Sequence, residues 1–458
     1  LVTPERFIDA YLSRNEKLAD LMRRMGFCEE KGSGLDKVIF YNELYQLPPI
    51  SVTIVENRTK VVMYSYKIGI SAEEHDRFVR RSSLVNLLQS SAWASVKSEW
   101  ENERVGFYSD NQIVAVASLL YRSLPFGFTM CYIARGPILD YTDQSLMDFV
   151  FSSLKKIAQK KRALFIKIDP ALCLNKTYID GQFYDYSEET LKTLNYLQKL
   201  GFIWSGKTSG MIDTIQPRIQ AKVYKENFDE KYLPKSARQA IRTAQNKGIT
   251  IQFGGIELLE SFSFLMKKTE ARKSIHLRNE AYYRNLLLSF PDHAYITLST
   301  LDLPNRLNIL EEQRNQNQKI LESLSATVKS SKYQSRLQES ERLNEEILFL
   351  EKYISSGVQV APLSATLTLE FGQTSVNLYA GMDVEFRRYN APILTWYRTL
   401  QHAFERGSIW QNLGGIEHTR DGGLYRFKAN FNPTIEEYLG EFTLPIHPLY
   451  PLINLLFN

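Results

Sequence analysis

The chain has few cysteines, and none of the spacings that cysteine-based sites require. Only Cys28, Cys131 and Cys173 occur in 458 residues, far apart and without a CxxC pair. We therefore predict neither a disulfide framework nor a zinc site, and expect a reducing compartment. The six histidines are scattered, so we expect no metal and no histidine-based triad.

Long apolar runs and common catalytic signatures are also missing. No stretch of about 18 uncharged apolar residues could span a membrane, and no secretory signal precedes the first charged segment. We find no GxGxxG opening a helix, no GxSxG and no HExxH, and we expect no phosphate-binding loop. The sequence therefore predicts a cytoplasmic or peripheral protein that uses neither acyl-CoA nor another cofactor.

Charge of one sign is not in large excess. The 56 Lys and Arg residues against 51 Asp and Glu give a net charge of +5, and 44% of the residues are hydrophobic. This composition predicts a globular protein of two or three domains. A basic cluster at residues 231–248 could contact the phosphates of a nucleic acid, although a solvated helix face explains it nearly as well.

Four segments can be distinguished along the chain. Residues 1–62 form an N-terminal appendage, and residues 303–355 form an insertion without glycine. Strand-like and helical runs alternate in residues 63–213, continued by about 437–458, and again in residues 214–436. This alternation predicts an α/β fold with two similar domains in tandem.

The insertion at residues 303–355 carries leucine and isoleucine at heptad spacing on both sides of a turn near Ser330. This pattern predicts an antiparallel coiled-coil hairpin inside the second domain, with charged residues such as Arg306 on its exposed side. A mechanical spacer, a dimer contact and an accessory arm for a nucleic acid are all compatible with the pattern.

The N-terminal appendage resembles part of another family. The strings at residues 14–18 (RNEKL) and 29–35 (EEKGSGL) resemble the C-terminal tail of RecG-like, ATPase-related regulators. The nucleotide-handling part of that family is not among these residues, so we expect no ATPase activity. A passive appendage left by gene fusion is the simplest interpretation.

Six further strings identify a resemblance over about residues 63–458. They are LQSSAWASVK at 88–97, RGP at 135–137, IDP at 168–170, IQPR at 215–218, NLGGI at 412–416 and LYRFK at 424–428. Together they resemble the FemABX family of tRNA-dependent peptidoglycan aminoacyltransferases. The resemblance implies two acetyltransferase-like (GNAT-like) domains with an inserted coiled-coil arm. The segment at residues 63–70 is most similar to the streptococcal cross-bridge branch.

The resemblance implies a reaction as well as a fold. In this family an aminoacyl group leaves the ribose of a tRNA and is taken by the stem-peptide lysine, or by a residue already on it, of a lipid-linked precursor. The streptococcal branch implies alanine or serine as the amino acid. The implied partners are aminoacyl-tRNA, lipid II and the inner face of the cell membrane, with no DNA.

The resemblance also implies functional residues. Lys97, Arg278 and Tyr282 match the positions that bind the diphosphate of the precursor, for which fixed cations are suited. Lys97 could equally be a solvated lysine on a helix. Tyr379 matches a substrate-pocket tyrosine, or it could pack in the core. Two residues earlier, Asn377 stands where the family can carry another tyrosine.

The chemical step is assigned to three further residues. Lys428, beside Phe427, would stabilise the oxyanion that forms when an amine attacks an ester, or would hold a tRNA phosphate. Asp169 matches an acidic position and would accept a proton from the amine, or would simply end a strand. The competing interpretation is an inactive regulatory, DNA-binding or scaffold protein that uses the appendage and the hairpin.

Overall fold

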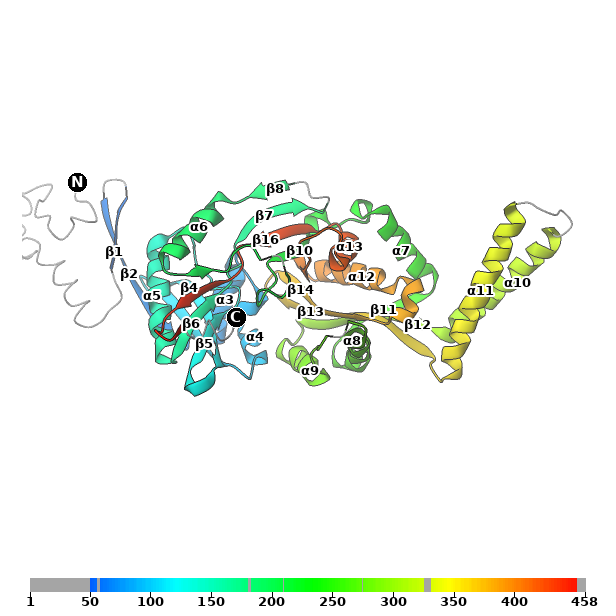
Figure 1. Cartoon of the computed structure of the whole chain (residues 1–458), viewed down its shortest axis with the longest axis horizontal. Helices are drawn as coiled ribbons and strands as arrows, with labels where there is room; N and C mark the ends of the chain where they lie inside the picture. The colour runs from blue at the N-terminus through cyan, green and yellow to red at the C-terminus, as the bar shows by residue number, and fades with distance from the viewer. Residues whose placement is uncertain are drawn as a thin grey trace, which may run out of the picture. The chain divides into compact units, whose positions relative to one another are not determined.

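The structure, a computed structural model, describes residues 50–55, 58–179, 183–208, 210–273, 275–324 and 331–450. The chain divides into two compact units, unit 1 with residues 1–175, 186–218 and 437–458, and unit 2 with residues 176–185 and 219–436 (Figure 1). The N-terminal appendage lies outside the described residues up to residue 49 and again at residues 56 and 57. Among the described helices, none has the length and hydropathy needed to cross a bilayer.

Unit 1 is built on an eight-stranded sheet in the order β1-β2-β3-β4-β5-β6-β17-β9. Among the described residues of this sheet β5 and β6 pair in parallel, and the other neighbouring strands pair antiparallel. The strands are β1 (Ile50–Val55), β2 (Arg58–Ile68), β3 (Glu101–Ser109), β4 (Gln112–Ser123), β5 (Thr129–Ile133), β6 (Ala163–Ile168), β9 (Ile203–Trp204) and β17 (Phe442–Pro445). The helices are α3 (Ala72–Arg81), α4 (Ser91–Val96), α5 (Gln144–Lys160) and α6 (Glu188–Lys199).

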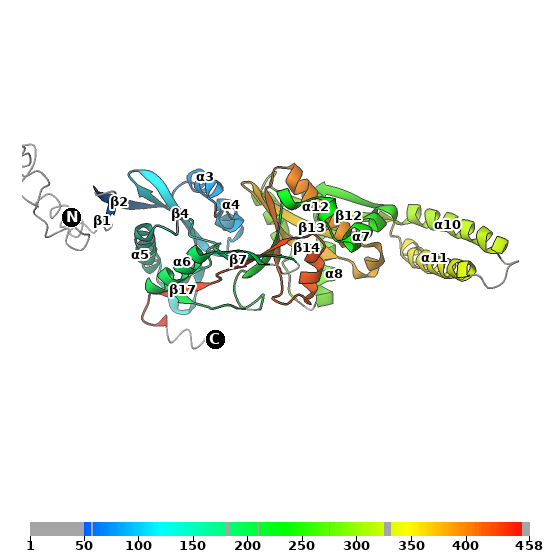
Figure 2. The ribbon, with the colours of Figure 1, turned by 90° about the horizontal axis from the view of Figure 1, so that it is seen from above.

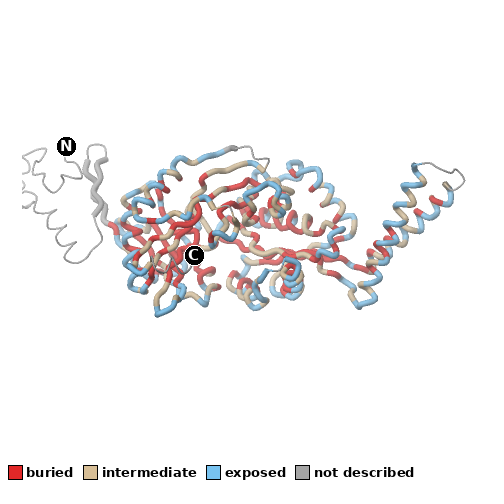
Figure 3. The backbone as a smooth tube through the Cα atoms, in the orientation of Figure 1, coloured by how far each residue is buried: buried red, intermediate tan, exposed pale blue. Residues whose placement is uncertain are grey.

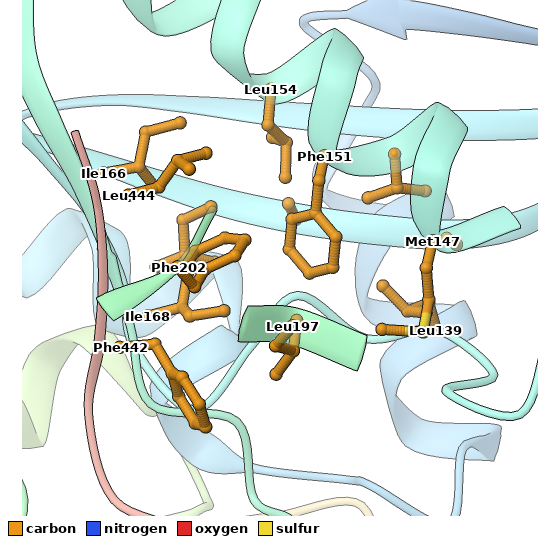
Figure 4. Close-up of a cluster of buried hydrophobic side chains, with 14 of the residues drawn as sticks. Leu139, Met147, Phe151, Leu154, Ile166, Ile168, Leu197, Phe202, Phe442 and Leu444 are labelled. Atoms are coloured by element: carbon orange, nitrogen blue, oxygen red, sulfur yellow. The ribbon is translucent and has the colours of Figure 1, made fainter. Parts of the chain in front are cut away.

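Helix α5 supplies one side of the main core of unit 1. The Asp143 side chain caps its first turn by accepting a hydrogen bond from the Leu146 amide at 2.9 Å. Met147, Phe151 and Leu154 follow at helical spacing and are buried against the sheet (Figure 4). This spacing is a local property of the sequence, which is why a helix can be predicted here without knowledge of the rest of the fold.

Unit 2 is built on a nine-stranded sheet in the order β11-β12-β13-β14-β15-β10-β16-β7-β8. The strands are β7 (Cys173–Tyr178), β8 (Phe183–Tyr186), β10 (Ile219–Tyr224), β11 (Ile249–Gly254), β12 (Ala294–Asp302), β13 (Val360–Phe371), β14 (Thr374–Met382), β15 (Trp410–Gly415) and β16 (Thr434–Tyr438). The helices are α7 (Lys235–Asn246), α8 (Leu259–Lys273), α9 (Glu280–Ser289), α10 (Leu303–Leu324), α11 (Ser331–Ser355), α12 (Ala391–Glu405) and α13 (Gly423–Ala429). The predicted α/β fold with two sheet-based units is confirmed.

The hairpin of α10 and α11 extends away from the sheet of unit 2 between β12 and β13 (Figures 1 and 2). Its inner half is not a separate coiled coil, because Leu303, Leu310, Leu343, Ile347 and Leu350 belong to the main core of unit 2. Farther out the hairpin is mostly tan and pale blue in Figure 3, which marks half-buried and exposed residues. The hairpin is therefore anchored in unit 2 by its base.

A buried ion pair corrects the expectation that Arg306 is exposed. Arg306 is 4% exposed, and its guanidinium donates to Oε1 of Glu346 from Nε at 3.1 Å and from Nη2 at 2.9 Å. Lys247 and Arg342 lie 3.9 and 3.4 Å from Oε2 of the same carboxylate. A heptad pattern shows which apolar residues form the seam, but it cannot show that a charged residue finds a buried partner.

Candidate active site

Unit 2 contains a cavity of about 580 Å³ where two parallel strands separate. Strands β14 and β15 pair only from Thr374↔Trp410 to Val376↔Asn412. Beyond this point residues 377–382 of β14 and 413–415 of β15 line opposite sides of the cavity, with Trp396 of α12 and residues of α8 and α13 completing it. Because the two strands no longer pair with each other beyond this point, room for a ligand is left between them.

Lys428 lines the cavity and has a pKa far from its ordinary value. It lies on the short helix α13, is 5% exposed, and its Nζ donates to the Gly415 carbonyl at 2.7 Å. Burial lowers the pKa of Lys428 to about 7, and the Glu417 carboxylate opposes this decrease. The ammonium and the free amine are thus both accessible near neutral pH, which suits a group that acts in chemistry.

The backbone around Lys428 is shaped by Gly414. This glycine has a φ of +87°, and a Cβ on it would lie 3.4 Å from the Lys428 Nζ. Glu417 fixes the other side by accepting hydrogen bonds from the Leu424 and Tyr425 amides at 3.1 and 2.9 Å, in the first turn of α13. The lysine is thus positioned by the loop between β15 and α13.

Three of the predicted residues form a cluster beside the cavity. The guanidinium of Arg278, just before α9, stacks 5.1 Å from the Tyr282 ring, and Tyr282 meets Tyr379 edge to face at 6.2 Å. Burial raises the pKa of Tyr379, while side-chain hydrogen bonds with Tyr282 and Arg278 oppose the increase. Tyr379 also lines the cavity together with Phe427 and Lys428.

Asn377 brings an unused hydrogen-bond donor to the same cavity. It is 7% exposed, and its Oδ1 accepts from the Thr368 hydroxyl at 2.9 Å. Its Nδ2 has no hydrogen-bond partner among the described residues. A buried donor without a partner costs free energy unless a ligand or water satisfies it.

In unit 1 a buried carboxylate follows the end of the parallel strand pair. Strands β5 and β6 pair in parallel up to Ile133↔Ile168, and Asp169 follows directly. Its carboxylate is 1% exposed and accepts from the Arg135 amide at 2.7 Å and the Tyr132 hydroxyl at 3.0 Å. Burial raises the pKa of Asp169 to about 6, and the Arg135 guanidinium opposes this increase. This arrangement holds the 135–137 turn in place.

Lys97 does not lie within a helix, in contrast to the alternative of a solvated lysine on a helix. Helix α4 ends at Val96, and Lys97 is its C-cap residue with φ −85° and ψ 47°. Its ammonium lies 4.9 Å from the centre of the Trp93 ring. Lys97 and Asp169 thus belong to unit 1, and the other five predicted site residues lie in unit 2.

Two features escaped the sequence interpretation. Glu417 was not singled out, because no motif marks an acid that caps a helix seven residues later. Residues 201–208 (GFIWSGKT) do have the spacing of a phosphate-binding loop. In the structure they follow α6 and contain the short strand β9, and residues 210–218 carry no helix, so the helix that must follow such a loop is not formed there.

No group of His, Cys, Asp and Glu suited to holding a metal ion occurs in the part of the chain that the structure describes. Comparisons with known proteins support the resemblance seen in the sequence. The model of the FemAB family matches residues 70–457, and that of the putative ATP-dependent DNA helicase recG C-terminal matches residues 2–63.

The similar proteins cover most of the chain. The lipid II:glycine glycyltransferases of Staphylococcus aureus strains MRSA252 and NCTC 8325 are each 28% identical to it over 415 residues, which are 85% of this chain and 95% of theirs. The crystal structure of FemX matches with a TM-score of 0.67 and 26% identity, covering 85% of this chain and 99% of that one.

Proposed function

The chain belongs to the FemAB family, and from this premise we propose that it is a tRNA-dependent aminoacyltransferase of peptidoglycan synthesis. It takes an amino acid from aminoacyl-tRNA and attaches it to the stem-peptide lysine, or to a residue already on that lysine, of lipid II. The cavity with the buried Lys428 carries this proposal, because acyl transfer needs a positive group where negative charge develops.

In this reaction the amine of the acceptor attacks the ester carbonyl of the charged tRNA. A C–N bond forms, the carbonyl oxygen becomes an oxyanion, and the C–O bond to the ribose then breaks. The Lys428 ammonium stabilises the oxyanion, and Phe427 and Tyr379 line the same cavity around the aminoacyl group. The amine gives up one proton, and the ribose oxygen takes one as it leaves.

Lys97, Arg278 and Tyr282 are proposed to bind the diphosphate of the precursor. Arg278 is exposed and stacked on Tyr282, which restricts the guanidinium without neutralising it.

Asp169 is proposed as the acceptor of the amine proton, supported by its pKa of about 6. Because its carboxylate is enclosed, Asp169→Asn would separate this role from support of the turn: a lost base lowers kcat, whereas a lost turn lowers stability.

The transferred amino acid is proposed to be alanine or serine. The relatives named above are glycyltransferases, so glycine is the alternative that an experiment must separate. Asn377 is proposed to donate a hydrogen bond from Nδ2 to a carbonyl of the bound substrate, where a tyrosine in the family would place a ring. Asn377→Ala should therefore weaken substrate binding more than it weakens folding.

The test is transfer of a radiolabelled amino acid from charged tRNA to a lysine-containing muropeptide. Alanyl-, seryl- and glycyl-tRNA are compared as donors, and a muropeptide with an acetylated lysine ε-amine is the control acceptor. Transfer from alanyl- or seryl-tRNA is expected, and transfer from glycyl-tRNA alone would contradict the choice of amino acid. A folded chain inactive with all three donors would favour the regulatory or scaffold alternative. Because the acceptor is linked to a lipid, we propose that the protein works at the inner face of the cell membrane and contacts it peripherally from the cytoplasm.

A further inference from the structure

An exposed aromatic side chain stands at the tip of the loop between β4 and β5. Phe126 is 90% exposed, with Pro125 and Gly127 also exposed on either side of it. Its φ of +61° is rare for a residue other than glycine. A conformation that costs free energy, at a side chain whose exposure also costs free energy, calls for an explanation.

The loop is held firmly in this conformation. The Leu124 amide donates to the Phe128 carbonyl at 2.8 Å, and Nη2 of Arg162 donates to the Phe126 carbonyl at 3.3 Å. The Arg162 guanidinium also stacks 5.1 Å from the Phe128 ring. Phe126 is therefore presented to solvent by a supported loop.

The turn that supports the loop is basic. Strands β5 and β6 begin at the same edge of the sheet, and the Thr129 amide donates to the Arg162 carbonyl at 3.1 Å. This edge carries the exposed cations Arg122, Lys160 and Arg162, whereas Lys161 is paired with Glu101 and Glu103. These three cations form no ion pair within the part of the chain that the structure describes, and an apolar tip with such cations around it is complementary to an anionic lipid surface.

The same end of unit 1 carries the predicted diphosphate contact. Leu124, Trp100 and Ala94 of α4 pack on one small apolar cluster, and Lys97 lies between Ala94 and Trp100 in the chain. In a lipid-linked precursor the diphosphate joins the sugar to the lipid and so lies at the membrane surface. A protein that binds it there must bring this part of unit 1 to the bilayer.

We propose that the β4–β5 loop is a membrane-docking element, in which Phe126 inserts into the interface of an anionic bilayer and Arg122, Lys160 and Arg162 contact lipid phosphates. This inference rests on the proposed function for its purpose, since docking brings unit 1 to a lipid-linked substrate. Its physical basis is the exposure of Phe126 and the charge around it.

The experiment is sedimentation of the full-length protein with vesicles of phosphatidylcholine alone or mixed with phosphatidylglycerol. Binding should be stronger to the anionic vesicles and should weaken with salt. Phe126→Ser should lower the partition coefficient by about tenfold or more, because burying one Phe is worth at least that factor. Lys160→Gln should lower it by about fivefold.

Two variants serve as controls. Ile212→Ser removes an apolar side chain that is 94% exposed but is followed by Asp213, and it should leave vesicle binding unchanged. Phe126→Trp keeps an aromatic ring and should retain binding. The proposal is overturned if Phe126→Ser binds anionic vesicles like the original chain, or if Ile212→Ser loses binding equally.

Activity measurements separate this inference from the proposed function. With a water-soluble muropeptide, Phe126→Ser should transfer the amino acid as fast as the original chain. With lipid II in anionic vesicles it should show a raised KM. If neither acceptor is used but vesicle binding still depends on Phe126, the transferase proposal fails and the docking element stands.

Discussion

Replacing Lys428 by methionine should remove a pH dependence of stability that the buried lysine imposes on unit 2. Burial lowers the pKa of Lys428 from 10.5 to about 7, which corresponds to about 5 kcal/mol by which the folded state disfavours the ammonium, at about 1.4 kcal/mol per pKa unit. Between pH 7 and 10.5 the unfolded chain binds a proton that the folded chain lacks. The free energy of unfolding therefore rises with pH in this window, and below it the full cost is present.

The measurement is urea unfolding of both proteins at pH about 6 and about 9, in which the unfolding transition of unit 2 is followed. The difference in stability between the original chain and Lys428→Met should change by about 2.5–3 kcal/mol between these conditions, in favour of lysine at the higher pH. Groups common to both proteins cancel in this comparison. A difference that does not change with pH would refute the assignment of a buried lysine with a lowered pKa.

The same residue predicts the pH profile of the reaction. If the Lys428 cation stabilises the oxyanion, kcat/KM for charged tRNA should fall as pH rises through about 7. Lys428→Arg keeps a cation at all these pH values, so the decrease in kcat/KM should shift to a higher pH. Lys428→Met should lower kcat by about 10²–10³-fold, as for loss of an oxyanion donor. An alkaline limb that persists in Lys428→Met would show that another group titrates.

Three further predictions concern separate parts of the chain. Lys97→Ala and Arg278→Ala should each weaken muropeptide binding by about 1.5–3 kcal/mol, less at high salt, and calorimetry that shows unchanged affinity in both would contradict the diphosphate assignment. Deleting residues 1–59 should leave transfer activity intact, whereas a folded but inactive product would make this segment part of the catalytic unit. Replacing residues 314–338 of the hairpin by a short Gly/Ser linker should raise the KM for charged tRNA and spare kcat, and the opposite pattern would place the arm in the chemical step.

The design of that last variant follows from a difference between sequence and structure. The heptad pattern predicted a coiled-coil hairpin over residues 303–355, but Leu310 and Leu350 lie in the core of unit 2. Each buried leucine removed costs about 2–5 kcal/mol, so excision of the whole hairpin should unfold unit 2. Apolar spacing identified the two helices, while their shared core depends on contacts with distant segments.

The candidate site shows the same division between local and distant information. Helix α5 and strand β6, which ends just before Asp169, can be predicted from the local spacing of apolar residues. For α5 the capping residue Asp143 adds a second local signal. The cavity arises because β14 and β15, whose paired residues Thr374 and Trp410 lie 36 positions apart in the sequence, pair briefly and then separate. No local pattern reveals where a parallel pair ends, so neither the burial of Lys428 nor the unpaired donor of Asn377 could be predicted.

The anchored hairpin has a mechanical consequence. Helix α10 continues directly from β12, α11 leads into β13, and β13 pairs with β14, which lines the cavity. The Leu303 amide donates to the Gln359 carbonyl at 2.9 Å and closes the base of the hairpin, where Arg306 and Glu346 are locked together. Because α10 follows β12 without an intervening loop and its base is fixed by these contacts, we expect a force applied at the outer end of the arm to be transmitted to the strands that line the cavity.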